Sequence, residues 1–182
     1  MTFKLWGRPT SARTEKVMLA LAELNIEHDY ILSSATMGPD GSVTKGGKAF
    51  GIVDTPEYLA MNPNGTVPTI NDNGYVLWES NAIIQYLGMK YDPGLFYDND
   101  IETYGSAARW LMWENNQLIP PMHELVMHLV RLPEDQRDTR EAEKARQKLI
   151  KEFTIIEEQL GKTEYISPNR WTMGDIPLTI RC

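Results

Sequence analysis

Two short segments hold the residue types that a peptide-binding site needs. Val67-Pro68 precedes a short apolar strand, and proline is the residue whose preceding peptide bond is readily cis. A cis bond would turn the chain and leave the main-chain groups of Val67 free to pair with an extended peptide. Glu79-Ser80 then opens a predicted helix, whose first N–H groups and positive dipole end suit a carboxylate. Together these segments predict a site for a small acidic peptide.

Ser11 is the residue best placed to do chemistry, because it begins the first predicted helix directly after the loop that follows the first strand. A hydroxyl there that donates a hydrogen bond to an anionic group favours the ionised form of that group, and the positive end of the helix adds to the effect. Serine is also a preferred N-cap, and composition alone favours that role. Thr10 is a rival hydroxyl. Arg13 is either a further positive charge beside such an anionic group or a solvated surface charge.

The elements around these residues predict a small α/β unit. Val17, Ala20, Leu21 and Leu24 give the first helix one apolar stripe. Strand, helix, strand implies a parallel crossover. In order, we expect a strand at residues 3–6, a helix that Asn25 ends, a strand at 28–32, a glycine-rich surface loop at 33–54, a short helix from Thr55-Pro56 to residue 61, strands at 69–70 and 75–77 joined by a turn at Asn73-Gly74, and a helix from Glu79-Ser80 to about residue 89.

Helical periodicity dominates everything beyond Asp92-Pro93-Gly94, which marks a linker. Pro120-Pro121 should bend the first long helical segment. Pro133 to Asp135 should start the next long helix, and Gly161 should end it. Thr172–Asp175 is a variant capping box for a last, buried helix. We therefore expect a domain at residues 1–89, a linker at 90–97 and an all-helical domain at 98–182.

The bulk properties exclude several classes of function. The 182 residues carry a formal net charge of −7 and no dense lysine or arginine cluster, which argues against nucleic-acid binding. The one cysteine is Cys182, so an internal disulfide is excluded. The start of the chain lacks the apolar core of a signal peptide, and no run has membrane-spanning length. We expect a cytoplasmic protein.

Five motifs occur in one order over almost the whole chain. They are Pro9-Thr10-Ser11-Ala12-Arg13 before Lys16-Val17, Pro56-Glu57-Tyr58-Leu59, Asn62-Pro63-Asn64-Gly65-Thr66-Val67-Pro68, Glu79-Ser80-Asn81-Ala82-Ile83 with Tyr86-Leu87, and Thr172-Met173-Gly174-Asp175-Ile176. With these motifs the chain resembles the cytosolic glutathione transferases. Trp6 stands where the tyrosine-type classes carry their hydroxyl, so the resemblance is to the bacterial, serine-type classes.

The resemblance implies a thioredoxin-like N-terminal domain, ordered βαβ-α-ββ-α, that binds glutathione. It also implies an all-helical C-terminal domain that supplies the pocket for a small hydrophobic electrophile, and a homodimer without a metal. Ser11 would activate the glutathione thiol, with Arg13 as a second catalytic candidate. The glutathione-binding residues would be Thr66, Val67, Pro68, Glu79 and Ser80, with Glu79 and Ser80 holding the γ-glutamyl end.

The chain departs from the family pattern in two places. The loop at 33–54 is longer than usual, which leaves the contact to the glycine end of glutathione unplaced, with Lys45 and Lys48 as candidates. The chain also ends at Cys182, inside the last helix, so we expect a shortened C-terminal domain. Thiol conjugation is the leading function. The alternatives are glutathione-dependent isomerisation, dehalogenation or disulfide reduction, and a non-catalytic binding or regulatory role.

Two further groups of residues are better explained by structure than by function. Tyr104, Trp110, Met112 and Trp113 fall in the helix that usually faces the electrophile pocket, but aromatics at helical spacing are more often core. His123 and His128 stand five residues apart, which puts them on different faces of an α-helix. We therefore expect no metal site there.

Overall fold

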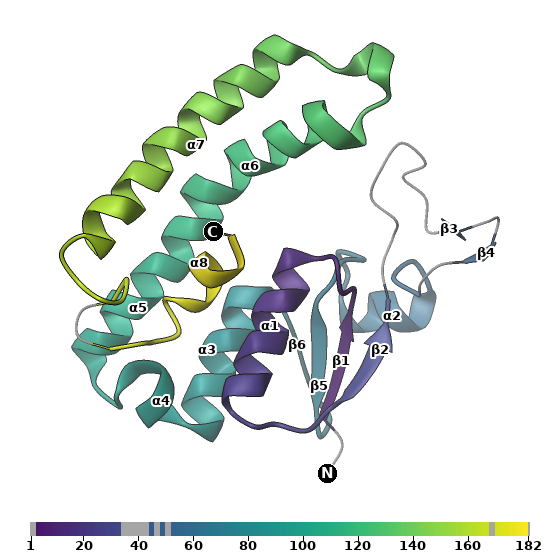
Figure 1. Cartoon of the computed structure of the whole chain (residues 1–182). Helices are drawn as coiled ribbons and strands as arrows, with labels where there is room; N and C mark the ends of the chain where they lie inside the picture. Colours follow the sequence, from purple (N-terminus) through teal and green to yellow (C-terminus); the bar gives the residue numbers. More distant parts are fainter. Residues whose placement is uncertain (1–2, 34–43, 46–47, 50–51, 168–169, 182) are drawn as a thin grey trace.

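The protein, analysed as a computed structural model, is described over residues 3–33, 44–45, 48–49, 52–167 and 170–181 (Figure 1). The first half forms a mixed sheet with helices on it, and the second half is helical. The first half consists of β1 (Phe3–Gly7), α1 (Ala12–Glu23), β2 (Asp29–Leu32), β3 (Thr44–Lys45), β4 (Lys48–Ala49), α2 (Pro56–Met61), β5 (Thr69–Asp72), β6 (Tyr75–Trp78) and α3 (Ser80–Tyr91).

The main sheet has the strand order β2-β1-β5-β6. Strands β1 and β2 are parallel, as the crossover predicted, while β5 is antiparallel to both β1 and β6. The predicted order βαβ-α-ββ-α is confirmed. The short antiparallel pair β3–β4 lies within residues 33–54 and corrects the expectation of a loop without strands. The rest of that segment falls largely outside the described residues.

Local signals explain the ends of these elements. Asn25 has a φ of 52° and follows α1 as the predicted left-handed stop. Thr55 caps α2 by accepting from the Tyr58 N–H, with Pro56 at the first helical position. Asn73 and Gly74 have φ values of 51° and 98°, as the two central residues of a type I′ hairpin turn require.

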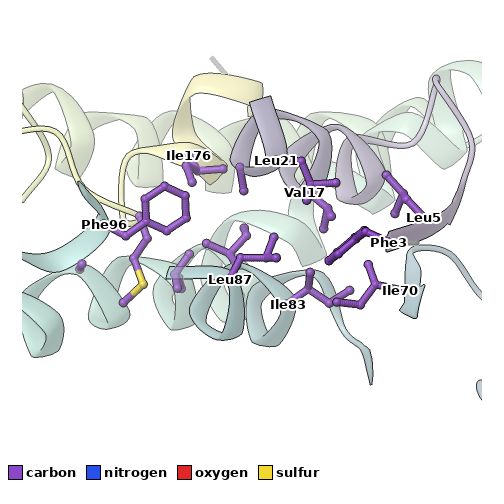
Figure 2. Packing of buried hydrophobic residues seen from close by; sticks show 14 residues of the cluster. Phe3, Leu5, Val17, Leu21, Ile70, Ile83, Leu87, Phe96 and Ile176 are labelled. Carbon is purple, nitrogen blue, oxygen red and sulfur yellow. The ribbon is translucent and has the colours of Figure 1, made fainter. Parts of the chain in front are cut away.

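Alternation along β1 divides the core between the two faces of the sheet. Leu5 packs on the face that α1 and α3 cover, whereas Trp6 packs on the opposite face with Val53 and Tyr58. Trp6 is therefore a core residue. Figure 2 shows that Phe96 and Ile176, which come from the helical half, extend the first of these clusters. The two halves consequently share one continuous apolar core.

The helical half differs from the sequence expectation in three places. Its elements are α4 (Pro93–Tyr97), α5 (Ile101–Trp113), the π-helix η1 (Glu114–Leu118), α6 (Ile119–Val126), the π-helix η2 (Met127–Arg131), the 3₁₀-helix η3 (Glu134–Gln136), α7 (Thr139–Leu160) and α8 (Ile176–Arg181). The predicted linker contains α4, whose Phe96 is fully buried. The division into domains at 1–89 and 98–182 remains a prediction.

The other two differences concern helix continuity. Regular α-helical bonding is interrupted by η1 directly before Pro120-Pro121, where a bend was expected. The predicted start of the next long helix at Pro133 is wrong, because only the 3₁₀ turn η3 forms there. Helix α7 starts instead after Asp138, whose carboxylate accepts from the Arg140 N–H. Its end at Gly161 is confirmed.

Asp175, directly before the last helix, makes buried carboxylate contacts to the loop that precedes it. Asp175 Oδ2 accepts from the main-chain N–H and the hydroxyl of Thr172, at 2.8 and 3.1 Å. Its other oxygen accepts from the Ile166 N–H at 2.8 Å. The carboxylate half of the predicted capping box, from Asp175 back to Thr172, is thus present, while Thr172 Oγ1 accepts from the Gly174 N–H and not from that of Asp175. Across the described residues, no helix is both long and apolar enough to span a membrane.

Candidate functional site

The strand register brings the predicted site segments to one edge of the sheet, formed by the C-terminal ends of β1 and β6 and the N-terminal end of β5. Thr69 pairs with Trp6 on one side and with Trp78 on the other. The chain therefore passes that edge three times: after Trp6, before Thr69 and after Trp78. The segment after Trp6 leads to Ser11, the segment before Thr69 contains Val67, and the segment after Trp78 is Glu79-Ser80. These three predicted segments meet although they are far apart in the sequence.

Ser11 is the N-cap of α1. Its Oγ accepts from the Thr14 N–H at 3.4 Å, and its backbone is extended, with a φ of −99°. The cap uses an oxygen lone pair and leaves the hydroxyl proton free to donate elsewhere. The side chain is half-buried, so a ligand can reach it. The capping and catalytic interpretations of Ser11 are therefore compatible.

Arg13 and Thr10 flank Ser11 on exposed positions. Arg13 lies in the first turn of α1 and makes no ion pair with another described residue. An exposed guanidinium close to a helix N-terminus adds positive charge to the one that the helix dipole already supplies there. This position is compatible with both interpretations of Arg13 given above.

The segment before β5 presents a strand-like edge. The Val67-Pro68 peptide bond is cis. The main-chain N–H and C=O of Val67 make no hydrogen bond to another described residue, so they can pair with an extended ligand. The Val67 side chain packs against the cluster of Trp6, Val53 and Tyr58, and the Thr66 side chain is exposed.

Tyr58 and Asn62 hold this edge in place, and the sequence interpretation assigned neither of them a role. The Tyr58 hydroxyl donates to the Thr66 carbonyl at 2.7 Å, and Asn62 Nδ2 donates to the same oxygen at 2.9 Å. Both also contact Thr69 Oγ1, at 2.8 and 3.1 Å. Burial raises the pKa of Tyr58, which keeps it neutral and able to donate. The signal for Asn62 was its place at the head of an Asn-Pro-Asn-Gly turn.

That turn also requires its glycine. Gly65 has a φ of 58°, a conformation that side chains with a Cβ rarely adopt, and an added Cβ would lie 3.0 Å from the Val53 carbonyl oxygen. The turn therefore passes close against Val53, in the segment before α2.

Glu79 and Ser80 occupy the start of α3, as predicted. Glu79 is the N-cap and has a φ of 73°, unusual for a residue that is not glycine. Such backbone conformations are enriched at ligand-binding positions. Its side chain is exposed and makes no capping hydrogen bond. Ser80 is the first helical residue, so its N–H has no intrahelical acceptor. This helix end can hold an anion beside a free carboxylate.

Two of the predicted pocket residues on α5 contact other side chains of the fold. Trp110 is buried against Trp113, with ring centroids 5.3 Å apart, which favours the core interpretation for Trp110. The Tyr104 hydroxyl donates to Gln85 on α3 at 2.7 Å, and Met112 is exposed. The side chains of Lys45 and Lys48 lie outside the described residues.

His128 has a local structural role. His128 Nδ1 accepts from the Asp138 N–H at 3.1 Å, next to the start of α7. Within the described part of the chain, no group of three or more His, Cys, Asp or Glu side chains lies close enough to hold a metal ion.

The sequence matches a family model described as the glutathione S-transferase N-terminal domain over residues 10–89. The glutathione S-transferase GstB of Escherichia coli K12 is 32% identical over 176 residues, which cover 96% of this chain and 78% of that protein. A glutathione S-transferase of Silene vulgaris is also 32% identical and covers 97% of this chain and 78% of its own length.

A solved structure shows the same fold. The theta class glutathione S-transferase of Xanthomonas axonopodis pv. citri with glutathione bound superposes with a TM-score of 0.83 at 33% identity, over 97% of this chain and 79% of that one. The chain therefore belongs to the glutathione S-transferase family. The resemblance and the fold class predicted from the five motifs are confirmed.

Proposed function

We propose that this protein is a glutathione transferase that activates the glutathione thiol for attack on a small hydrophobic electrophile. One observation carries the proposal. The strand register brings the segments that contain Ser11, the main chain of Val67 and the Glu79-Ser80 helix start to the same edge of the sheet. A thiol peptide that spans this edge would meet a hydroxyl, a strand-like main chain and a carboxylate-binding helix end in turn.

The thiol is activated at Ser11. Its hydroxyl donates to the sulfur while its oxygen still accepts from Thr14, so the thiolate gains a hydrogen bond and the field of the α1 N-terminus. The thiol proton leaves to solvent. The sulfur lone pair then forms the new bond to the electrophilic atom, and the leaving group departs with the electrons of the bond that breaks. Arg13 would add to the positive field as a second catalytic residue.

The rest of the site orients glutathione. Glu79 accepts from the γ-glutamyl ammonium, and the Ser80 N–H and hydroxyl donate to the adjoining carboxylate. The main chain of Val67 pairs with the cysteinyl unit, with Pro68 setting the turn and Thr66 lining the groove. Holding the sulfur beside a bound electrophile lowers the barrier further, because the entropy of bringing the two together is lost on binding.

The same proposal includes a cytoplasmic homodimer, as the family resemblance implies. The mass of the protein in solution, measured by light scattering during size-exclusion chromatography, tests the dimer. A mass of one 20.8 kDa chain at micromolar concentration would refute it.

The function is tested by assaying the protein with glutathione against aryl halides, epoxides, organic peroxides and disulfides. Calorimetry measures the affinity for glutathione in parallel. Conjugation of an aryl halide or an epoxide is the expected result. Binding without turnover of any compound would favour the non-catalytic alternative, and activity confined to disulfides or to dehalogenation would favour the corresponding alternative. Absence of glutathione binding would refute the proposal as a whole.

A further inference from the structure

Four polar side chains meet in the interface between the two halves of the chain. Lys16 Nζ on α1 donates to Asn81 Oδ1 on α3 at 2.8 Å and to Glu114 Oε2 in η1 at 3.0 Å. Glu114 Oε1 accepts from Arg181 Nε on α8 at 3.0 Å. Lys16 and Glu114 are fully buried. These four residues are called the Lys16–Glu114 network.

Asn81 is held by both halves of the chain. Its Oδ1 accepts from Lys16 of the sheet half, and its Nδ2 donates to the Leu111 carbonyl of the helical half at 2.6 Å. The π-helix η1 begins at Glu114, three residues after that carbonyl, and π turns recur at functional sites. The side-chain amide of Asn81 therefore fixes the beginning of α3 against α1 and α5 together.

Stability alone does not explain this network. It places one fully buried and one partly buried cation against a single carboxylate, and a well-packed apolar cluster of similar volume is often at least as stable as a buried ion pair. Burial lowers the pKa of Lys16 to about 8, although Glu114 opposes the shift; Arg181 and Arg13 add to it. A group that is held at this electrostatic cost suggests a benefit other than stability.

The network lies directly behind the residues of the proposed site. Asn81 follows Glu79 and Ser80 in the sequence, and Lys16 lies five residues after Ser11 on α1. Helices α1 and α3 pack side by side, with their N-termini toward the same edge of the sheet (Figure 1). The hydrogen bond from Lys16 to Asn81 thus joins α1, which follows the thiol-activating Ser11, to α3, which begins at Glu79-Ser80. These two residues are called the γ-glutamyl clamp.

We propose that Lys16 and Glu114 are positioning residues that act through Asn81 to hold the Glu79-Ser80 clamp in register with Ser11. The γ-glutamyl end and the thiol of one glutathione molecule then meet their partners at the same time. The proposal rests on the proposed function, and it adds a requirement for the helical half of the chain in binding glutathione.

The test compares the wild type with Lys16→Met, Glu114→Gln and the double variant Lys16→Met/Glu114→Met. Calorimetry gives the affinity for glutathione and for S-methylglutathione, which has no thiol to ionise. Steady-state kinetics gives kcat and the KM of each substrate. We expect both affinities to fall about tenfold, as for loss of one hydrogen bond to a charged group. The KM for glutathione should rise and kcat should fall, with the KM for the electrophile unchanged.

The double variant separates positioning from stability. Lys16→Met leaves Glu114 paired with Arg181 alone, and Glu114→Gln leaves the buried Lys16 without a carboxylate, so both are expected to destabilise the fold. The double variant leaves only the partly exposed Arg181 charged. It should therefore regain much of the thermal stability and still bind glutathione weakly. If Lys16→Met does not fold, the double variant carries the test by itself.

Lys90→Met is the matched control, because Lys90 makes an ion pair at the C-terminal end of α3, far from the Glu79-Ser80 clamp at its start. Its Nζ donates to the buried Asp72 Oδ2 at 2.7 Å. The variant should lose stability and keep the wild-type affinity for glutathione. Loosening of α3 in general would instead weaken binding in this control as well, and would overturn the proposal.

The remaining outcomes separate this proposal from the proposed function. A wild type that does not bind glutathione refutes the proposed function. A wild type that binds, with network variants of unchanged affinity and kcat, leaves the function intact and overturns the positioning role. If the double variant recovers the wild-type affinity for glutathione together with its stability, the positioning role is overturned too.

Discussion

Substitutions at Ser11 separate its two roles, as the cap of α1 and as the activator of the thiol. The Thr14 N–H lies 3.4 Å from Ser11 Oγ, beyond the usual range for such a bond. The cap should therefore contribute near the low end of its range, about 0.5 kcal/mol to the stability of the fold. A hydroxyl that donates to a thiolate should contribute about 1.5–3 kcal/mol, which corresponds to a rise of about one to two units in the thiol pKa when it is removed.

Three variants test these magnitudes. Ser11→Ala removes both roles, so stability should fall slightly while the pKa of bound glutathione rises strongly. Ser11→Asp keeps the cap but places an anion beside the thiolate, so stability should be retained and the thiol pKa should rise. Ser11→Thr keeps both roles and should stay close to the wild type.

Urea unfolding measures stability, and the ultraviolet absorbance of the thiolate, followed from pH 5 to 10, gives the thiol pKa of bound glutathione. The reasoning is refuted if Ser11→Ala loses stability yet leaves the thiol pKa unchanged. Such a result would make Ser11 only a cap and would transfer activation to Thr10 or Arg13.

Three further predictions concern the clamp and two buried carboxylates. Glu79→Ala should weaken glutathione binding by about 1 kcal/mol or more by calorimetry, whereas Glu23→Ala at the far end of α1 should not; equal affinities would remove Glu79 from the clamp. Burial opposes ionisation of Asp72, but hydrogen bonds from Lys90, Tyr91 and Tyr86 lower its pKa to about 2. Because this pKa lies below the 3.8 of an unperturbed aspartate, Asp72 should contribute about 2 kcal/mol above pH 4, lost as the pH falls through 2. Asp72→Asn should abolish that part of the acid dependence of urea unfolding, and an unchanged profile would contradict it. Asp175→Ala should cost about 2 kcal/mol or more, because it leaves the N–H groups of Ile166 and Thr172 without their acceptor, and the KM for glutathione of the folded protein should not change. A changed KM with intact stability would show that Asp175 acts in the site.

Most of the first half could be predicted from local signals. Asn25, Thr55-Pro56 and Asn73-Gly74 each have a backbone preference strong enough to end a helix, start a helix or close a hairpin. Local signals failed where two of them competed. Pro133 fits the start of a helix as well as Asp138 does, and only the structure shows that α7 begins after Asp138. Strands β3 and β4 are two residues each, too short for any periodicity to show.

The sequence leads to proposed ligand contacts for the site, but it does not reveal the residues that support them. The motifs identified Ser11, Val67 and Glu79 because their types and order carry the chemistry. Lys16 and Glu114 are 98 residues apart in the sequence, and nothing local links them. Lys16 does share a helix face with Ala20, which is buried, but a lysine on such a face is almost always solvated. Residues that act through long-range pairing need the fold before they can be found.

A crystal structure of the protein with bound glutathione tests the central claim most directly. We expect the sulfur within hydrogen-bonding distance of Ser11 Oγ, the cysteinyl unit paired with the main chain of Val67, and the γ-glutamyl carboxylate at the Ser80 N–H. A sulfur that lies out of reach of Ser11, or a γ-glutamyl group bound away from the start of α3, would contradict the account.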